Sequence, residues 1–320
     1  MTGDLARKSG RELALLALCL VVLLALPSLI TGSYGRHLLI VSLVYAVVAA
    51  CWDVSLGFAG LFNFAHLAFF GIGVYVSAIL SKLIGLDPWL SILLAGLFAT
   101  AAAAIVSLPV IRLRGIYVVL VTFAFGQLVQ QIVLSQAGIT GGSQGMVMVP
   151  ALHLGSYNFA RDQKLAYCYA AIALLAVSVL LLRWLMASPL GVAMRAVRDD
   201  ESYAAARGIS AARTHLLAIV ASAPLTGIAG GFFGAYSRVA STEVFGFGTL
   251  SLVLSMVLLG GTGTLYGPIL AAFLITFTSE ALVGLGLWRF LIISAGMILV
   301  LVALPGGVAS IPQLFRRKTY

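Results

Sequence analysis

Long apolar segments recur from one end of this chain to the other, and they decide what it can fold into. Hydrophobic residues make up 62% of the 320 positions, and the mean hydropathy is +1.11. A soluble domain of this length could not bury that much apolar surface. The segments contain Gly and Pro and lack the ten-residue alternation of barrel strands, which favours helices. The sequence therefore predicts an all-α integral membrane protein, folded as a polytopic helical bundle.

The apolar segments that can cross a bilayer predict about ten transmembrane helices. We treat the first, 13–30, as a retained span rather than a signal peptide, because it is long and lacks a clear small-residue cleavage site. The eighth, 249–262, is short and ends in glycines, which predicts a half-helix packed inside the bundle. The predicted spans are 13–30, 38–56, 62–81, 89–111, 116–135, 165–182, 214–236, 249–262, 265–283 and 290–304.

The distribution of lysine and arginine predicts how the chain is oriented. Of 19 basic residues, 13 fall in segments that ten crossings with a cytoplasmic N-terminus would keep inside. Because cytoplasmic loops of inner-membrane proteins collect basic residues, we expect a multi-pass bacterial-type inner-membrane protein, N-in and C-in. The same bias explains the net charge of +9 without nucleic acid. The predicted parts are a cytoplasmic tail at 1–12, a transmembrane domain at 13–304 and a basic cytoplasmic tail at 305–320.

One cytoplasmic segment, 188–213, is dense in charge in a chain with only 9% charged residues. It has the pattern of two short helices. Pro189 suits a helix start, where its missing N–H costs nothing. Asp199 or Asp200 can cap a second helix, and Gly208 suits the left-handed residue after its end. A stiff amphipathic element of this kind could seat in a groove of a soluble partner, although it could also be an ordinary charged loop between spans.

The energy for the work of this protein is expected to come from such a partner. The chain has no Walker-type sequence and no convergent catalytic set, so we expect no enzyme activity and no cofactor bound by this chain. Arg195, Arg198, Glu201 and Gly208 are the candidate residues for coupling to that partner.

Polar residues inside the predicted spans are candidates for a solute pathway. Asn63 and His66 lie three residues apart on one helical face. They could bind a zwitterionic or amide solute, or they could bond to a neighbouring helix. Gln127 in the fifth span is open to the same two interpretations. We expect no metal at His66, because no second ligand has a suitable spacing.

Two other classes of protein are alternatives to a membrane transporter driven by a soluble partner. A transporter driven by an ion gradient needs buried carboxylates in mid-membrane, and Asp53 and Glu280 are both predicted near span ends. A structural or assembly subunit would carry no solute. Ser222 and Thr226 flank Pro224 in the seventh span, which predicts a fixed kink or a hinge there.

Together these segments resemble the permease subunits of branched-chain amino-acid ABC importers, the LivM type, over roughly 38–305. The resemblance is carried by GFAGLFNFAHLAFFGIGVY at 57–75, by RLRGIYVVLVTFAFG at 112–126 with TGGSQG at 140–145, and by GVAMRAVRDDESYAAARGI at 191–209 with GGTGTLYGP at 260–268.

The resemblance implies a set of partners that the residues alone do not show. These are a second, related permease subunit in the same lipid bilayer, two cytoplasmic ATPases that would hydrolyse the ATP, and an extracytoplasmic substrate-binding protein. The segment 191–209 is similar to the element that enters an ATPase groove. Glu201, Ala204, Ala205 and Gly208 match that pattern, whereas Ser202-Tyr203 departs from it. The family also includes importers of urea, short amides and other small solutes, so branched-chain amino acids are the expected but not the sole candidate substrate.

Overall fold

The computed structural model describes residues 21–30, 32–155, 157–159, 164–286, 288–303 and 307. The tail predicted at 1–12, the start of the first predicted span and nearly all of the tail predicted at 305–320 lie outside these residues. Residues 21–29 are helical, and each later predicted span overlaps a helix.

The apolar helices and the elements between them have the following bounds. The apolar helices are α2 (Ser33–Asp53) with its π-helical continuation η1 (Val54–Phe58), α3 (Ala65–Lys82), α4 (Pro88–Val110), α5 (Ile116–Ser135), α7 (Leu165–Ala187), α10 (Ala211–Ser237), α11 (Phe247–Gly260), α12 (Tyr266–Ala281) and α13 (Trp288–Ala303). The connecting elements are α6 (Ala137–Thr140), α8 (Pro189–Asp199), α9 (Glu201–Ala206), the 3-10 turns η2 (Gly142–Gln144), η3 (Thr242–Phe245) and η4 (Val283–Leu285), and the strands β1 (Met146–Val147), β2 (His153–Leu154), β3 (Tyr157–Asn158) and β4 (Val239–Ala240).

Among the described residues, six helices are long and apolar enough to span a membrane: α2 with η1, α3, α4, α5, α7 and α10. Helices α11, α12 and α13 are shorter, at 14, 16 and 16 residues. The all-α membrane fold is therefore confirmed, whereas the count of about ten crossings stays a prediction.

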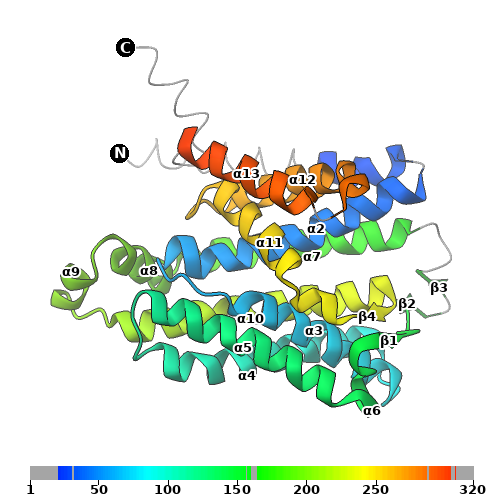
Figure 1. The fold of residues 1–320 in the computed structure, drawn as a ribbon, viewed down its shortest axis with the longest axis horizontal. Helices are drawn as coiled ribbons and strands as arrows, with labels where there is room; N and C mark the ends of the chain where they lie inside the picture. The colour runs from blue at the N-terminus through cyan, green and yellow to red at the C-terminus, as the bar shows by residue number, and fades with distance from the viewer. Residues whose placement is uncertain are drawn as a thin grey trace.

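The bundle has two distinct ends, which Figure 1 shows at the left and the right. At the α8–α9 end, Arg114 before α5 lies 3.5 Å from Glu201 at the start of α9. At the β-ribbon end, strand β1 pairs with β4, and Lys82 at the end of α3 donates to the Val147 carbonyl over 2.6 Å. The segment 188–213, predicted to be cytoplasmic, thus lies at the opposite end from the loop between α5 and α7, which ten crossings with a cytoplasmic N-terminus would place outside.

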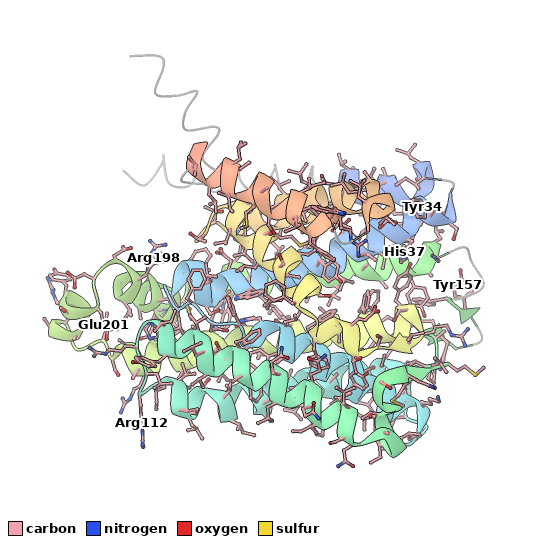
Figure 2. All side chains as sticks on the ribbon, in the orientation of Figure 1. Tyr34, His37, Arg112, Tyr157, Arg198 and Glu201 are labelled. Carbon is pink, nitrogen blue, oxygen red and sulfur yellow. The ribbon has the colours of Figure 1, made fainter. Side chains whose placement is uncertain are left out.

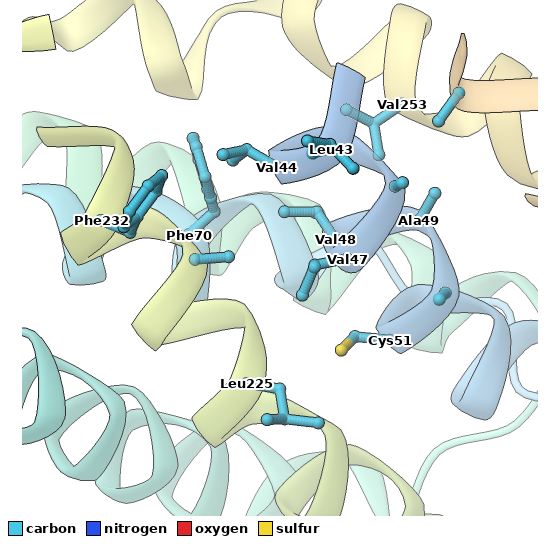
Figure 3. Close-up of a cluster of buried hydrophobic side chains, with 14 of the residues drawn as sticks. Leu43, Val44, Val47, Val48, Ala49, Cys51, Phe70, Leu225, Phe232 and Val253 are labelled. Carbon is cyan, nitrogen blue, oxygen red and sulfur yellow. The ribbon is translucent and has the colours of Figure 1, made fainter. Parts of the chain in front are cut away.

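Helix α2 occupies the centre of the bundle. Its side chains from Leu39 to Trp52 are almost wholly buried, and Figure 3 shows several of them beside Phe70 of α3, Phe232 of α10 and Val253 of α11. Such a helix is apolar on all sides because protein, rather than water or lipid, surrounds it. Any movement of α2 would therefore displace side chains in most of the surrounding helices.

Helices α3 and α10 cross closely because both carry glycine at the crossing. A Cβ atom added to Gly73 would collide with the Gly227 carbonyl, and one added to Gly230 would collide with the Phe70 carbonyl. Small residues that allow such backbone contact are typical of packed membrane helices.

The turn before helix α11 packs against the middle of α3, whereas the half-helix predicted at 249–262 stays a prediction. The turn η3 before it places the Phe245 ring against Gly71, in the middle of α3, and stacks that ring on Tyr75 with centroids 6.1 Å apart. The helix then ends at Gly260, and Gly261 and Gly263 take positive φ angles of 97° and 75°. Backbone that is not helical at this depth is tolerated because neighbouring protein covers it.

Candidate functional site

The segment predicted to dock a partner forms the two short helices that its sequence indicated. The Ser188 side chain caps α8 by accepting from the Gly191 amide at 3.4 Å, and Pro189 occupies the first turn. Asp200 caps α9 by accepting from the Tyr203 amide at 2.9 Å. After α9, Gly208 takes a φ of +82°. Local capping and turn chemistry therefore fix the shape of this segment.

Helix α8 lies against the bundle by one face and leaves α9 exposed. The buried face of α8 consists of Gly191, Met194 and Val197, whereas in α9 only Ala204 is buried. Tyr203 is 60% exposed and Val192 is 55% exposed, beside charged groups. An exposed mixture of apolar and charged side chains on short, rigid helices is suited to contact with a soluble protein.

The four candidate coupling residues all lie at this end, but they face different ways. Arg195 is half-buried on α8, and Gly208 is exposed after α9. Glu201 pairs with Arg114, and the two side chains are 48% and 88% exposed. Arg198 turns back to the bundle, where its Nη1 donates to the Gly57 carbonyl at 3.2 Å. Figure 2 shows Arg198 and Glu201 at the α8–α9 end.

The carboxylate of Asp53 lies directly beneath this segment, and its burial adds to the sequence analysis. We expected Asp53 near a span end, and it lies five residues before the end of its span at Phe58, yet it is 0% exposed. Its two oxygens accept from the Gly263 amide at 2.8 and 3.1 Å. Nearness to a span end does not expose this side chain, because η1 and the turn before α12 cover it.

Asn63 and His66 belong to a buried polar cluster at mid-depth. The His66 Nδ1 lies 3.2 Å from the Asn63 Oδ1, and its Nε2 lies 2.9 Å from the Ser222 Oγ on α10. The Trp52 indole donates to the Asn63 carbonyl at 2.7 Å and stacks on the His66 ring. Asn63, His66 and Ser222 are each 0% exposed. In this structure the cluster joins α2, α3 and α10.

Gln127 lies apart from that cluster, on a different surface. It lines a small hollow of about 10 Å³ between α3, α5, η3 and α11, room for about one water molecule. The hollow is lined by Phe64, Leu67, Ala68, Phe123, Gly126, Gln127, Phe245 and Leu250. None of these side chains is charged, so this point of the bundle presents aromatic rings and one amide.

The helix that carries Gln127 is the least buried of the long helices. Only Val118, Thr122 and Val133 of α5 are buried, and Gln127 and Gln131 are exposed. Gln127 lies 11 residues into α5, about 16 Å along its axis. The Gln127 side chain makes no hydrogen bond with any residue that the structure describes. An amide in this position is costly against lipid.

Sequence reasoning missed the groups that link the coupling segment to the bundle. Arg114, Asp53 and Gly263 had no assigned role, although Gly57 and Gly263 lie in two of the segments that carry the resemblance. The glycines in these segments indicated that another part of the chain could approach closely. They did not indicate which distant residue would do so.

Comparison with known proteins decides the family. Residues 36–302 match the family described as "Branched-chain amino acid transport system / permease component". The chain belongs to this family. It is 31% identical to the high-affinity branched-chain amino acid transport system permease protein LivM of Salmonella typhimurium, over 95% of this chain and 76% of that protein. It is 31% identical to LivM of Escherichia coli over 85% of this chain and 70% of that protein.

A second type of relative is also similar. The permease protein LivH of Salmonella typhimurium is 25% identical, over 84% of this chain and 92% of that protein. No solved structure matches the chain. This member of the branched-chain amino-acid permease family is therefore a LivM-type permease subunit of an ABC importer. The matched region includes Asp53, Gln127 and the whole α8–α9 segment.

Proposed function

We propose that this permease carries branched-chain amino acids across the inner membrane, using ATP hydrolysed by two separate cytoplasmic subunits. The observation that carries the proposal is the α8–α9 pair. It lies at one end of the helical bundle, and no other described part of the chain covers its outer surface. A protein that moves solute against a gradient needs an energy source, and a partner that binds two permease conformations with different affinity supplies it.

The ATPase contact is proposed at the exposed surface of the segment 188–213. Arg195, Arg198, Glu201 and Gly208 are assigned to coupling. Glu201 and Gly208 face outward with Tyr203, whereas Arg198 faces the bundle. We therefore divide the roles: the α9 side meets the ATPase, and Arg198 connects α8 to the permease itself.

A second permease subunit is proposed to cover the exposed face of α5. The similarity to both LivM and LivH supports a partner that is a related, different chain. The exposed amides of Gln127 and Gln131 at membrane depth also support it, since lipid would leave them without partners. A pathway between two subunits would give Gln127 water or solute, while Asn63 and His66, both 0% exposed, would support it from behind on the α3 side.

The topology proposed from the charge bias fits the arrangement of the two ends. The α8–α9 end would face the cytoplasm, together with both termini, and the β-ribbon end would meet an extracytoplasmic binding protein. Ten crossings follow if residues 13–30 and the short helices α11, α12 and α13 are each part of a crossing. The domain limits stay as proposed at 1–12, 13–304 and 305–320.

The hollow at Gln127 has room for about one water molecule, so it does not distinguish one solute from another. The candidate solutes are those that the resemblance implies: branched-chain amino acids, urea and short amides. The names of the relatives favour the amino acids. An ion-driven mechanism is not favoured by Asp53, although it is buried, because both carboxylate oxygens already accept from the Gly263 amide.

Reconstitution tests the proposal. The chain would be placed in proteoliposomes with a LivH-type permease, two ATPases and a binding protein, and uptake of labelled leucine and urea would be followed. We expect leucine uptake that requires ATP and the binding protein. Gradient-driven uptake by the chain alone would contradict the proposal, and uptake of urea in place of leucine would contradict the substrate.

The docking surface needs its own test. Glu201→Lys and Gly208→Leu should reduce co-purification of the ATPases. Glu243→Lys is the matched control, because Glu243 is also exposed but lies beside β4 at the opposite end. ATPases that remain bound to both loop variants would contradict docking at α8–α9.

A further inference from the structure

A fully buried carboxylate lies where three separate parts of the permease meet. Asp53 ends α2, Gly263 lies in the turn between α11 and α12, and Arg198 comes from α8. Two of the segments that carry the resemblance, 57–75 and 260–268, both contribute to this point. Their role is not explained by membrane packing or by the docking surface.

The contacts at this point are specific. Gly263 donates its amide to both Asp53 oxygens, at 2.8 and 3.1 Å, across 210 residues of sequence. Arg198 donates to the carbonyl of Gly57, one turn after Asp53, at 3.2 Å. A carboxylate that accepts an amide N–H in a buried place forms a stronger bond than a neutral acceptor would. The ends of α2 and of the α11–α12 hairpin are thus held together, and α8 is held to them.

Glycine is required at three positions for these contacts to exist. A Cβ atom at Gly57 would overlap the Asp53 carboxylate and the Gly263 amide. A Cβ at Gly263, where φ is +75°, would lie 2.8 Å from the Arg198 Nη1. A Cβ at Gly60, where φ is +68°, would lie 3.0 Å from the Arg198 Cγ. The Nη1 of Arg198 thus reaches glycine backbone, whereas its Nε and Nη2 pair with the neighbouring Asp199 at 3.0 and 2.8 Å, and the side chain is 36% exposed.

The backbone next to Asp53 is also unusual. Residues Val54–Phe58 form a π-helix, and all five residues are buried. Single π-helical turns within longer helices are frequent at functional sites, because the extra residue weakens the regular hydrogen-bond ladder. Here the π-helical turn follows the long rigid part of α2 directly and itself carries the contact with Arg198, through the Gly57 carbonyl.

We infer that Asp53, Gly57, Gly60, Arg198 and Gly263 form a joint that passes movement of α8 to α2 and to the α11–α12 hairpin. We call this set the Asp53 joint, and it rests on the proposed docking of an ATPase at α8–α9. Because α2 is buried at the centre of the bundle, displacement at its end is transmitted to α3, α7 and α10. Without the joint, α8 would be tied to the bundle by its apolar face and by chain continuity with α7 and α9.

The experiment measures coupling rather than activity alone. Asp53→Asn keeps the size of the side chain but replaces one acceptor oxygen by an NH₂ donor, which opposes the Gly263 amide. Ser55→Ala is the matched control: Ser55 is equally buried in η1, but its hydroxyl donates only within its own helix, to Trp52. Each variant of the reconstituted complex would be assayed for bound ATPase, ATP hydrolysis and solute uptake.

For Asp53→Asn we expect ATPases to remain bound and hydrolysis to continue, while solute taken up per ATP falls about tenfold, the factor that loss of one charge-assisted hydrogen bond can produce. Ser55→Ala should keep the normal ratio. An unchanged ratio in Asp53→Asn would overturn the inference. Loss of bound ATPase in Asp53→Asn would also overturn it, since the joint would then support docking alone.

A second variant keeps the inference testable if Asp53→Asn fails to fold. Arg198→Gln shortens the link from α8 and leaves Asp53 and Gly263 intact. If both residues act in one joint, Asp53→Asn combined with Arg198→Gln should reduce the ratio hardly more than either change alone. Effects that multiply would contradict a shared joint. Failure of the Glu201 and Gly208 variants to release ATPase would count against docking, and the double-variant result would still show whether the joint couples hydrolysis to uptake.

Discussion

His66 offers the sharpest test of whether the polar residues of α3 hold the bundle together or contact solute. The ring is 0% exposed, lies 2.9 Å from the Ser222 Oγ and stacks on Trp52 with centroids 6.0 Å apart. It does not line the hollow at Gln127. From this geometry we expect His66 to stabilise the packing of α3 against α2 and α10.

The structure sets the size of the expected loss. The bond to Ser222 is of the kind that contributes about 0.6 to 1.7 kcal/mol between membrane helices, and the stacked rings add about 1 kcal/mol. His66→Leu removes both while filling most of the space, so it should lower the free energy of unfolding by about 2 kcal/mol. His66→Ala also leaves a cavity in a fully buried place, which should bring the loss to about 4 kcal/mol.

The assay compares stability and transport in the same variants. Unfolding of the purified permease would be followed in mixed micelles with increasing denaturing detergent, and uptake would be measured in the reconstituted complex. We expect His66→Leu to unfold more easily than the parent but to keep most of its uptake. If His66→Leu had parental stability and no uptake, His66 would be a pathway residue and our interpretation of the cluster would be wrong.

Three further perturbations test other parts of the structure. Gln127→Glu places a charge on the exposed face of α5, where the proposed partner permease would bury it. We expect uptake of a zwitterion to fall by about tenfold at an unchanged amount of protein, since burying a charge there costs well over 1.4 kcal/mol. Gly73→Leu should abolish the folded permease in gel filtration, because its side chain would enter the backbone of Gly227. Thr140→Val removes a hydroxyl that accepts from the Gly142 amide at 3.2 Å. It should destabilise that loop by about 1 kcal/mol, measured as faster proteolysis at 136–145.

Local chemistry in the sequence was sufficient to predict the α8–α9 segment. Pro189, the cap at Asp200 and the turn at Gly208 each act within a few residues, so their effect does not depend on the rest of the fold. The apolar spans were predictable for a similar reason, since length and composition alone decide what can cross a bilayer.

Contacts between distant segments were not predictable in the same way. Asp53 was expected near a span end, and only the approach of Gly263 explains why it is buried. Ser222 was interpreted through its neighbour Pro224, yet α10 runs unbroken from Ala211 to Ser237 and the Ser222 hydroxyl faces His66. A sequence gives the face of a helix on which a residue lies, but the neighbour of that face depends on the packing of the whole bundle.

Polar residues at membrane depth can therefore be sorted by their partners. Asn63 Oδ1, His66 and Ser222 are enclosed and bonded to one another, so they contribute to holding helices together whether or not solute passes. Gln127 and Gln131 are exposed on α5 at similar depth. Because lipid cannot satisfy an amide, this second pair requires a partner from outside the described chain. That requirement, more than depth or residue type, is the reason to look for the solute pathway along α5.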